Sequence, residues 1–456
     1  MYTPADFRMP ETHRILPKTA ALHHKWRVAA SVLLALAGWS AAHAAVPATR
    51  TPDVYLLSPG ILVKTRQRVM HGDAALQPAL ASLKAAADKE LGGELAKVTD
   101  KPADIAGMVG GKHNYASVSV YFWPDEKDPS APWLMRDGQP NKEMIAKYDG
   151  GRMSAMLRRV TTCGLAYYFT NDRNYARRAA AQLRAWFLDP ATRMNPNMDY
   201  AQCVPNKSKG SPWGVIDANG MSHMLDSVAL LAGSGEWNER DNAALKQWFG
   251  EFSSWLTTSD LGRRERAAKN NHGTFYDLLL ARTALFAGNE ELARDVVQQF
   301  GPKRIATQVL PDGSTPHEQG RVDSASYTCW NLSGYADMLV LGRRLGIDLW
   351  QFRTTDGRSI RRAAEWFIPY VEDPAKWTFG NRKFSKTSPS GFFWMISAVT
   401  GDPKINRFFR SHMTPPNETG WHKNIQMLRW PMKDLTSESK QGSQPTNRTT
   451  TLNQIP

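Results

Sequence analysis

The chain has little cysteine, which limits how it can be cross-linked. Its 456 residues contain three cysteines, Cys163, Cys203 and Cys329, and no Cys-x-x-Cys pair. Three thiols cannot build a full disulfide framework, although one bridge is possible. A chain of this length can bury enough apolar surface to be stable without cross-links.

Several signatures of common enzyme classes are also missing. The sequence has no Gly-x-Ser-x-Gly, no P-loop, no Gly-x-Gly-x-x-Gly after a strand and no His-Glu-x-x-His. The usual sequence support for a serine hydrolase, an NTPase, a dinucleotide-binding enzyme or a zinc peptidase is therefore absent. Acidic pairs such as Asp125/Glu126 occur, but none is marked out as the acid/base pair of a glycosidase.

Acidic residues are fewer than basic ones. There are 43 Asp and Glu against 57 Lys and Arg, which gives a formal charge of +14 and a pI of about 9.6. Such an excess favours an anionic partner, which could be nucleic acid, a membrane surface or an acidic polymer. A solvated basic surface without a specific partner is the alternative explanation.

The N-terminus has the pattern of an export signal. Lys25 and Arg27 precede an apolar run over residues 28–39, and Ala42-His43-Ala44 follows. This is the order of a secretory signal peptide that is cleaved after Ala44. The leader is long, and Met9 is an alternative start. We therefore predict a periplasmic or secreted protein, and export favours an acidic glycan over nucleic acid as the partner.

The rest of the chain reads as one domain. No second long apolar stretch follows the signal, so no membrane span is expected in the mature form. Residues 434–456 are rich in Ser, Thr, Gln and Asn and are predicted to be a disordered tail. The predicted organisation is a signal peptide over 1–44, one domain over 45–433 and the tail.

Apolar residues recur at helical spacing along this domain. The clearest stretches are residues 75–95, 153–187, 221–231, 241–255, 275–286 and 327–345. Short alternating stretches typical of strands are rare, and residues 117–122 are the best of them. Similar turn motifs over residues 169–178, 286–295 and 399–408 join pairs of helices. Helical hairpins of irregular spacing predict an all-α fold, an incomplete (α/α) toroid with a long lid-like loop.

Three polar clusters could carry chemistry, and the first is Asn270-Asn271-His272 at the start of a helical stretch. An Asn there can simply cap the helix. The functional interpretation is that Asn271, His272 and free helix N–H groups form an anion site.

The second cluster precedes another helix, whose expected N-cap is Asp323 or Ser324. Arg321 then lies in the loop before the helix and Tyr327 in its first turn. The structural alternative is an Arg321 paired with Glu318 or Asp323, with an amphipathic Tyr327 at the surface.

The third cluster is an aromatic, Pro-rich segment over residues 121–138. Irregular segments of this length are often lids or binding loops. Tyr121 and Trp123 could stack on sugar rings while Arg136 reaches a carboxylate. The alternative is a loop whose aromatic residues hold it against the core.

Together these clusters resemble the alginate lyase family, helical-toroid polysaccharide lyases that act on polyuronates. The resemblance covers residues 115–370 approximately, and any one piece is weak while the ordered set is specific. The pieces, in family order, are Tyr121-Phe-Trp-Pro-Asp, Arg136-Asp-Gly, Asn141, Arg193-Met-Asn-Pro, Tyr200-Ala-Gln, Asn271-His272-Gly-Thr-Phe-Tyr-Asp, Ala293-Arg294, Gln308-Val-Leu-Pro-Asp-Gly-Ser, Glu318-Gln-Gly-Arg321, Ser324, Tyr327, Asn331-Leu332 and Gly346-Ile-Asp-Leu-Trp350.

The resemblance implies a site and a reaction. Asn271, His272 and Arg321 would neutralise the carboxylate of a uronate, and Tyr327 would move the protons. The substrate-binding residues would be Tyr121, Trp123, Arg136 and Gln202. No metal or organic cofactor is implied, and the expected partner is an anionic polysaccharide bound by a monomer. Arg321 and Tyr327 have the spacing found in the wider alginate lyase family. Members of that wider family act on several uronates, so the resemblance does not identify which polymer is cleaved.

These residue types suit β-elimination. The C5 proton of a uronate is very weakly acidic while the neighbouring carboxylate keeps its charge, so neutralising that charge is required. We expect surrounding positive charge to lower the pKa of Tyr327 so that it can take the C5 proton and then protonate O4. One residue can do both where C5–H and O4 share a face, as in mannuronate and glucuronate. In guluronate they lie on opposite faces, and His272 is the expected base.

Two other functions are compatible with the composition. A glycoside hydrolase on a similar toroid would need two carboxylates at the site. A non-catalytic glycan-binding protein would need neither Tyr327 nor a proton acceptor.

Overall fold

The computed structural model describes residues 51–380, 384, 390–412 and 428–429. The predicted signal peptide (1–44), both boundaries of the predicted domain and the predicted tail (434–456) lie outside these residues. The three cysteines are free, so the possible disulfide is not formed. None of the helices in the described ranges is long and apolar enough to cross a membrane.

The described chain is mainly helical, as predicted. The longer helices are α2 (Pro59–Met70), α3 (Gln77–Leu91), α6 (Gly150–Thr170), α7 (Arg173–Leu183), α8 (Met221–Leu230), α9 (Glu239–Thr258), α11 (Asn271–Ala287), α12 (Glu290–Phe300), α15 (Ser324–Arg344), α16 (Ile360–Glu372), α17 (Ser390–Thr400) and α18 (Pro403–His412). The shorter ones are α4 (Ala103–Met108), α5 (Lys142–Lys147), α10 (Asp260–Arg266), α13 (Ala306–Gln308) and α14 (Pro316–Gln319). Short strands are β1 (Ala116–Val118), β2 (Phe122–Trp123), β3 (Leu134–Met135) and β4 (Tyr200–Cys203).

The helices form the hairpins of an (α/α) toroid, which confirms the predicted fold class. The three turn motifs seen in the sequence join α6 to α7, α11 to α12 and α17 to α18. Each turn contains a residue in the left-handed region, with φ of 62° at Asn171, 95° at Gly288 and 64° at Gly401. Such a residue ends a helix and reverses the chain, which lets successive helices bury their apolar faces against each other.

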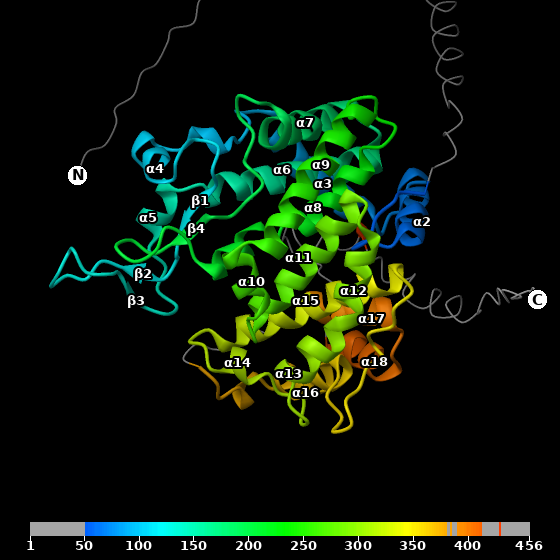
Figure 1. The fold of residues 1–456 in the computed structure, drawn as a ribbon. Helices are drawn as coiled ribbons and strands as arrows, with labels where there is room; N and C mark the ends of the chain where they lie inside the picture. The colour runs from blue at the N-terminus through cyan, green and yellow to red at the C-terminus, as the bar shows by residue number, and fades with distance from the viewer. Residues whose placement is uncertain (1–50, 381–383, 385–389, 413–427, 430–456) are drawn as a thin grey trace, which may run out of the picture. The chain divides into compact units, whose positions relative to one another are not determined.

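The centre of the described unit is the pair α11 and α15. α11 packs against α9, α12, α15 and α8, and α15 also packs against α17. Figure 1 shows α11 beside α15, with α12 next to both. The rings of Phe275 and Trp330 join the two helices near their first turns, 4.8 Å apart between centroids. The first two turns of α11 and α15 therefore lie against each other.

A buried polar network fixes the start of these two helices. The side-chain oxygen of Gln308, Oε1, accepts hydrogen bonds from Thr274 (3.0 Å), Asn331 (3.1 Å) and Tyr335 (2.7 Å). Its amide donates to the Asn270 carbonyl oxygen at 3.0 Å. Because the side chain of Gln308 bonds to residues of both helices, it holds α11 and α15 in register.

Two small sheets flank the helices. Strands β1 and β4 pair in parallel, and β2 and β3 form an antiparallel hairpin in which Phe122 faces Met135. The single strand expected over residues 117–122 is thus split between β1 and β2, with a break at residues 119–121. The hairpin and its flanks form the loop that the sequence predicted to act as a lid.

Candidate functional site

The first cluster lies at the N-terminus of α11. Asn270 is the N-cap, and its side chain accepts a hydrogen bond from the His272 N–H at 3.3 Å. The capping interpretation therefore applies to Asn270. Asn271 is the first helical residue and is 0% exposed, whereas the His272 side chain is 18% exposed. Of the predicted pair, His272 is the one that reaches the surface.

The anion at this helix N-terminus is a carboxylate of the protein itself. Glu318 on α14 accepts the Asn271 N–H at 2.6 Å and the Asn271 side-chain amide at 2.7 Å. The expectation that the helix N–H groups were free for a ligand is wrong for this N–H. Burial raises the pKa of Glu318, and the hydrogen bonds from Asn271 and the charges of His272 and Arg321 oppose that rise. His272 and Arg321 both lie close enough to Glu318 to affect its pKa, so the first and second clusters lie together.

His272 is oriented by a second buried carboxylate. Its Nδ1 lies 2.6 Å from Oε1 of Glu265, whose side chain is 3% exposed. The acceptor on Glu265 places the ring proton on Nδ1 and leaves Nε2 as the nitrogen available to a ligand. The partner comes from α10, which packs directly against α11.

The second cluster brings Arg321 and Tyr327 into direct contact. The Arg321 Nη2 donates to the Tyr327 hydroxyl at 3.0 Å, and the guanidinium lies 3.9 Å from the ring centroid. As predicted, Asp323 is the N-cap of α15, Arg321 precedes it and Tyr327 is in the first turn. The pair is therefore placed by the start of a helix.

The loop that carries Arg321 is held in place by contacts with residues 377–380. The Trp377 indole N–H donates to the Ser324 hydroxyl at 3.0 Å, and that hydroxyl donates to the Phe379 carbonyl oxygen at 2.7 Å. Gly380 follows with φ of 67°, and a Cβ there would lie 2.6 Å from the Arg321 carbonyl oxygen. Only glycine fits such a close backbone approach at positive φ.

The third cluster supplies two partners to the same site. Asp137, just after β3, accepts from Arg321 Nε at 3.1 Å and from Nη2 at 2.7 Å. The Tyr121 hydroxyl lies 3.0 Å from the Tyr327 hydroxyl. The structural alternative named Glu318 or Asp323 as the ion-pair partner of Arg321, and the structure shows a bidentate pair with Asp137, which the sequence did not indicate. Tyr121 before β2 and Asp137 after β3 thus contact Tyr327 and Arg321, respectively.

Arg136 and Trp123 are placed differently. Arg136 lies over the Trp123 ring, 5.6 Å from its centroid, and pairs with Glu126 at 3.1 Å. The Trp123 indole N–H donates to the Gln139 carbonyl oxygen. These contacts stay within the hairpin, and no contact found among the described residues joins either side chain to His272, Arg321 or Tyr327. Their predicted role in substrate binding stays a prediction.

Gln202 lies on the His272 side of the site. It adopts φ of 46°, which is unusual for a residue other than glycine, and its amide donates to Asp217 at 2.8 Å. Burial raises the pKa of Asp217, and its hydrogen bonds and the nearby charge of His272 oppose the rise. Strained backbone at such a position is consistent with a functional constraint.

Tyr327 differs from its prediction in one respect. We expected positive surroundings to lower its pKa. Burial instead raises the pKa of Tyr327 above the ordinary tyrosine value, the hydrogen bond with Tyr121 raises it further, and Arg321 opposes both effects. In the free protein Tyr327 is therefore a neutral phenol whose oxygen accepts from Arg321 and whose hydroxyl shares a hydrogen bond with that of Tyr121.

Four acidic partners of the site were not predicted as site residues. Glu318 and Asp137 stand inside the motifs Glu318-Gln-Gly-Arg321 and Arg136-Asp-Gly, so a signal for them existed. Glu265 and Asp217 stand in no motif, and only their contacts with His272 and Gln202 reveal them.

The Asp137–Arg321 pair gives a first testable prediction. Asp137→Asn keeps the size of the side chain but removes its charge, so Arg321 loses its bidentate partner and its fixed direction. We expect kcat/KM on a cleaved polyuronate to fall about tenfold, because misplaced catalytic groups react far more slowly. Glu143→Gln on α5 is the matched control, since Glu143 pairs with Lys147 at the surface. Equal kinetics for the two variants would contradict the role of the pair.

Comparison with known proteins gives a consistent result. A family profile described as alginate lyase matches residues 98–377. The crystal structure of an alginate lyase from Bacteroides ovatus is similar, with 33% sequence identity, a TM-score of 0.77 and coverage of 84% of this chain and 100% of that one. Alginate lyase A1-III from Sphingomonas species A1 shares the fold, with 16% identity, a TM-score of 0.51 and coverage of 76% and 94%. None of the curated protein sequences matches this chain.

Proposed function

Because the chain belongs to the alginate lyase family and is a polysaccharide lyase, we propose that it cleaves a 1,4-linked uronate polymer by β-elimination. The polymer is mannuronate-rich alginate or a glucuronate-containing glycan, and the products are 4,5-unsaturated oligosaccharides. The observation that carries the proposal is the direct contact of Arg321 and Tyr327 at 3.0 Å. It joins a cation that can hold a carboxylate to a hydroxyl that can move a proton.

The carboxylate would be neutralised by Arg321 and His272. Nη1 of Arg321 takes part in none of the bonds to Asp137 or Tyr327, and Nε2 of His272 is directed away from Glu265. On mannuronate and glucuronate His272 acts as the imidazolium, with protons on both ring nitrogens, so that Nε2 donates alongside Nη1 of Arg321. These two donors stabilise the dianion that forms when the C5 proton leaves, and one such donor in a preorganised site is worth about 3 kcal/mol. Asn271 is fully buried, so we assign it a positioning role: it holds the Glu318 carboxylate at the start of α11.

Tyr327 would take the C5 proton and return a proton to O4. The Arg321 N–H at its oxygen stabilises the phenolate, which makes Tyr327 a base despite its raised pKa. This single-residue route suits mannuronate and glucuronate, in which C5–H and O4 share a face. On guluronate His272 would be the base, with Glu265 stabilising the protonated ring.

The raised pKa of Tyr327 predicts an alkaline pH profile. Only the phenolate accepts a proton, so log kcat/KM should rise with pH on the alkaline side. Tyr121→Phe removes the hydroxyl whose hydrogen bond raises the pKa of Tyr327. The alkaline limb should then move to lower pH by up to about one unit, the equivalent of one hydrogen bond. The measurement is kcat/KM against pH for both proteins, and a limb that stays in place or moves to higher pH would contradict the assignment.

The location and state of the protein follow as part of the proposal. Export by the predicted signal peptide would put the enzyme in the periplasm or outside the cell, where anionic polysaccharides are found. We propose that it acts there as a monomer.

A substrate panel tests the proposal. Polymannuronate, polyguluronate, glucuronan and glycosaminoglycans are each incubated with the full chain, and the ultraviolet absorbance of the new C4=C5 double bond is followed. We expect absorbance to rise with polymannuronate or glucuronan and more slowly with polyguluronate. Shortened products without new absorbance would instead support a hydrolase.

A further inference from the structure

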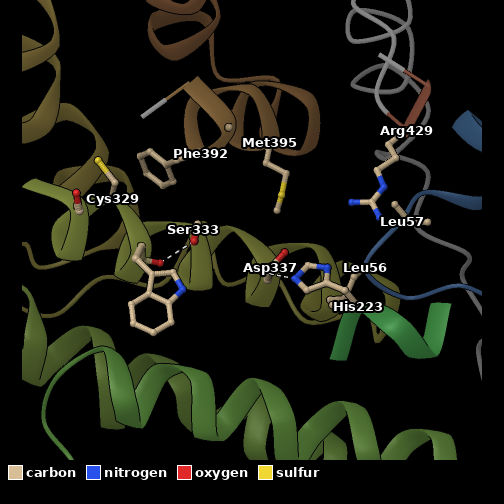
Figure 2. Close-up of a pocket in the computed structure, with 12 residues that line it drawn as sticks. Leu56, Leu57, His223, Cys329, Ser333, Asp337, Phe392, Met395 and Arg429 are labelled. Carbon is tan, nitrogen blue, oxygen red and sulfur yellow. Dashed lines mark hydrogen bonds and ion pairs between the residues drawn. The ribbon is translucent and has the colours of Figure 1, made fainter. Parts of the chain in front are cut away.

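A cavity of about 440 Å³ borders the site on the side of α15 that faces α17. Figure 2 shows Cys329, Ser333 and Asp337 of α15 along one wall and Phe392 and Met395 of α17 along the opposite wall. Its volume falls within the roughly 300–1,000 Å³ that is usual for small-ligand pockets. Nothing in the proposed chemistry at Tyr327 uses this cavity.

The cavity begins next to the catalytic candidates. Its lining includes Ser326 and Trp330, on either side of Tyr327 along α15. The ring centroids of Tyr327 and Trp330 are 6.1 Å apart. Trp330 is 37% exposed, and it is the one aromatic residue among the exposed large apolar side chains of the described chain. An exposed flat ring beside a reacting bond can stack on the apolar face of a sugar.

The far end of the cavity is polar. Figure 2 shows Asp337, His223 and Arg429 gathered there. Asp337 Oδ2 lies 3.1 Å from Nε2 of His223. The other oxygen, Oδ1, has no hydrogen-bond partner although the side chain is only 6% exposed. Nε of Arg429 is likewise buried without a partner. A carboxylate, an imidazole and a guanidinium therefore line one end of the cavity, and the His223 side chain is 37% exposed there, with Nδ1 free of the bond to Asp337.

The same end is closed by the N-terminal segment. Leu56 and Leu57 line it, and their N–H groups donate to Asp226 at 2.7 and 2.8 Å. Asp226 is itself held by Arg282 at 2.8 Å. Ten residues of helix separate Tyr327 from Asp337, which is about 15 Å at the rise of an α-helix. A polymer that passes Tyr327 along α15 therefore meets a wall after a short distance.

We propose that this cavity is a subsite for the end of the polysaccharide chain, so that the enzyme releases short oligosaccharides from a chain terminus. The inference rests on the proposed lyase function. A terminal sugar residue carries a free hydroxyl where an internal residue carries a glycosidic bond, and that hydroxyl donates to Nδ1 of His223, whose Nε2 is held by Asp337. Arg429 donates to the uronate carboxylate, and Trp330 stacks on the ring that lies between this end and the cleaved bond.

The product pattern of the full chain is the first test. Chain-end cleavage predicts that one short unsaturated oligosaccharide accumulates from the earliest time points while the viscosity of the polymer falls slowly. A broad ladder of early products with a rapid loss of viscosity would overturn the inference and leave the lyase function intact. No unsaturated product on any polyuronate would overturn both.

Two variants test the residues. Asp337→Asn should lower kcat/KM on short oligouronates about tenfold, as expected when a hydrogen bond to a charged group is lost, and should lengthen the early products. Asp295→Asn, an exposed carboxylate on α12, is the matched control. Trp330→Phe keeps a ring against Phe275, so it keeps the test available if Asp337→Asn does not fold, and it should raise KM because a smaller face is left for the sugar. If both variants showed the same kinetics and products as the control, the proposed subsite would be wrong.

Discussion

Replacing Tyr327 with phenylalanine should lower kcat by roughly a hundred- to ten-thousand-fold, the usual contribution of a proton-transferring side chain. The ring, its contact with Trp330 and its place in the first turn of α15 all remain. The hydroxyl that contacts Arg321 and Tyr121 is lost. Because the carboxylate-binding groups are untouched, the affinity for the polymer should change little. The measurement is kcat by ultraviolet absorbance together with calorimetric titration of an oligouronate.

Tyr168→Phe is the matched control for this variant. Tyr168 is buried on α6, and its hydroxyl has no hydrogen-bond partner, so its removal should leave kcat unchanged. If Tyr327→Phe keeps more than a tenth of the wild-type kcat, Tyr327 does not move the proton. If it instead loses binding and turnover together, the hydroxyl serves mainly to bind substrate.

Replacing Arg321 with lysine should lower kcat/KM about a hundredfold, in the range found when one preorganised charge-stabilising donor is removed. Lysine keeps the positive charge but lacks the planar fork that contacts Asp137 and Tyr327 at once. The substrate carboxylate is then neutralised less well, and the phenolate of Tyr327 loses its hydrogen bond. The measurement is kcat/KM on the polymer that is best cleaved in the substrate panel.

Arg294→Lys provides the comparison for Arg321→Lys. Arg294 on α12 pairs with Glu290 at 2.7 Å and also donates from Nη1 to the Leu345 carbonyl oxygen at 2.6 Å, so its guanidinium too makes two contacts at once. Its kinetics should equal those of the wild type. A small effect of Arg321→Lys, of the same size as that of Arg294→Lys, would show that charge alone suffices and that the bidentate geometry does not matter.

The local placement of the site could be predicted because helix starts leave clear signals. An Asn before an apolar helical stretch marked the start of α11, and Asp323 marked the start of α15. Residues near a helix start have fixed relative positions, so Arg321 before α15 and Tyr327 in its first turn follow from the sequence alone. The helical hairpins followed from the three turn motifs in the same way.

The partners of these residues could not be predicted from local pattern. Asp137 is 184 positions from Arg321, and Glu318 is 47 positions from Asn271. Only the folded chain brings them together. The same limit explains the wrong sign for the pKa of Tyr327: the charge of Arg321 could be foreseen, but the burial that outweighs it could not. It also explains why the free N–H expected at Asn271 is already bound to Glu318.

The most direct test of the account is the ratio of new double bonds to new reducing ends during cleavage of the preferred polyuronate. Double bonds are measured by ultraviolet absorbance and reducing ends by a colorimetric assay on the same samples. β-Elimination forms one C4=C5 double bond for each glycosidic bond that breaks, so the account predicts a ratio of one throughout the reaction. Reducing ends that increase without double bonds would contradict it.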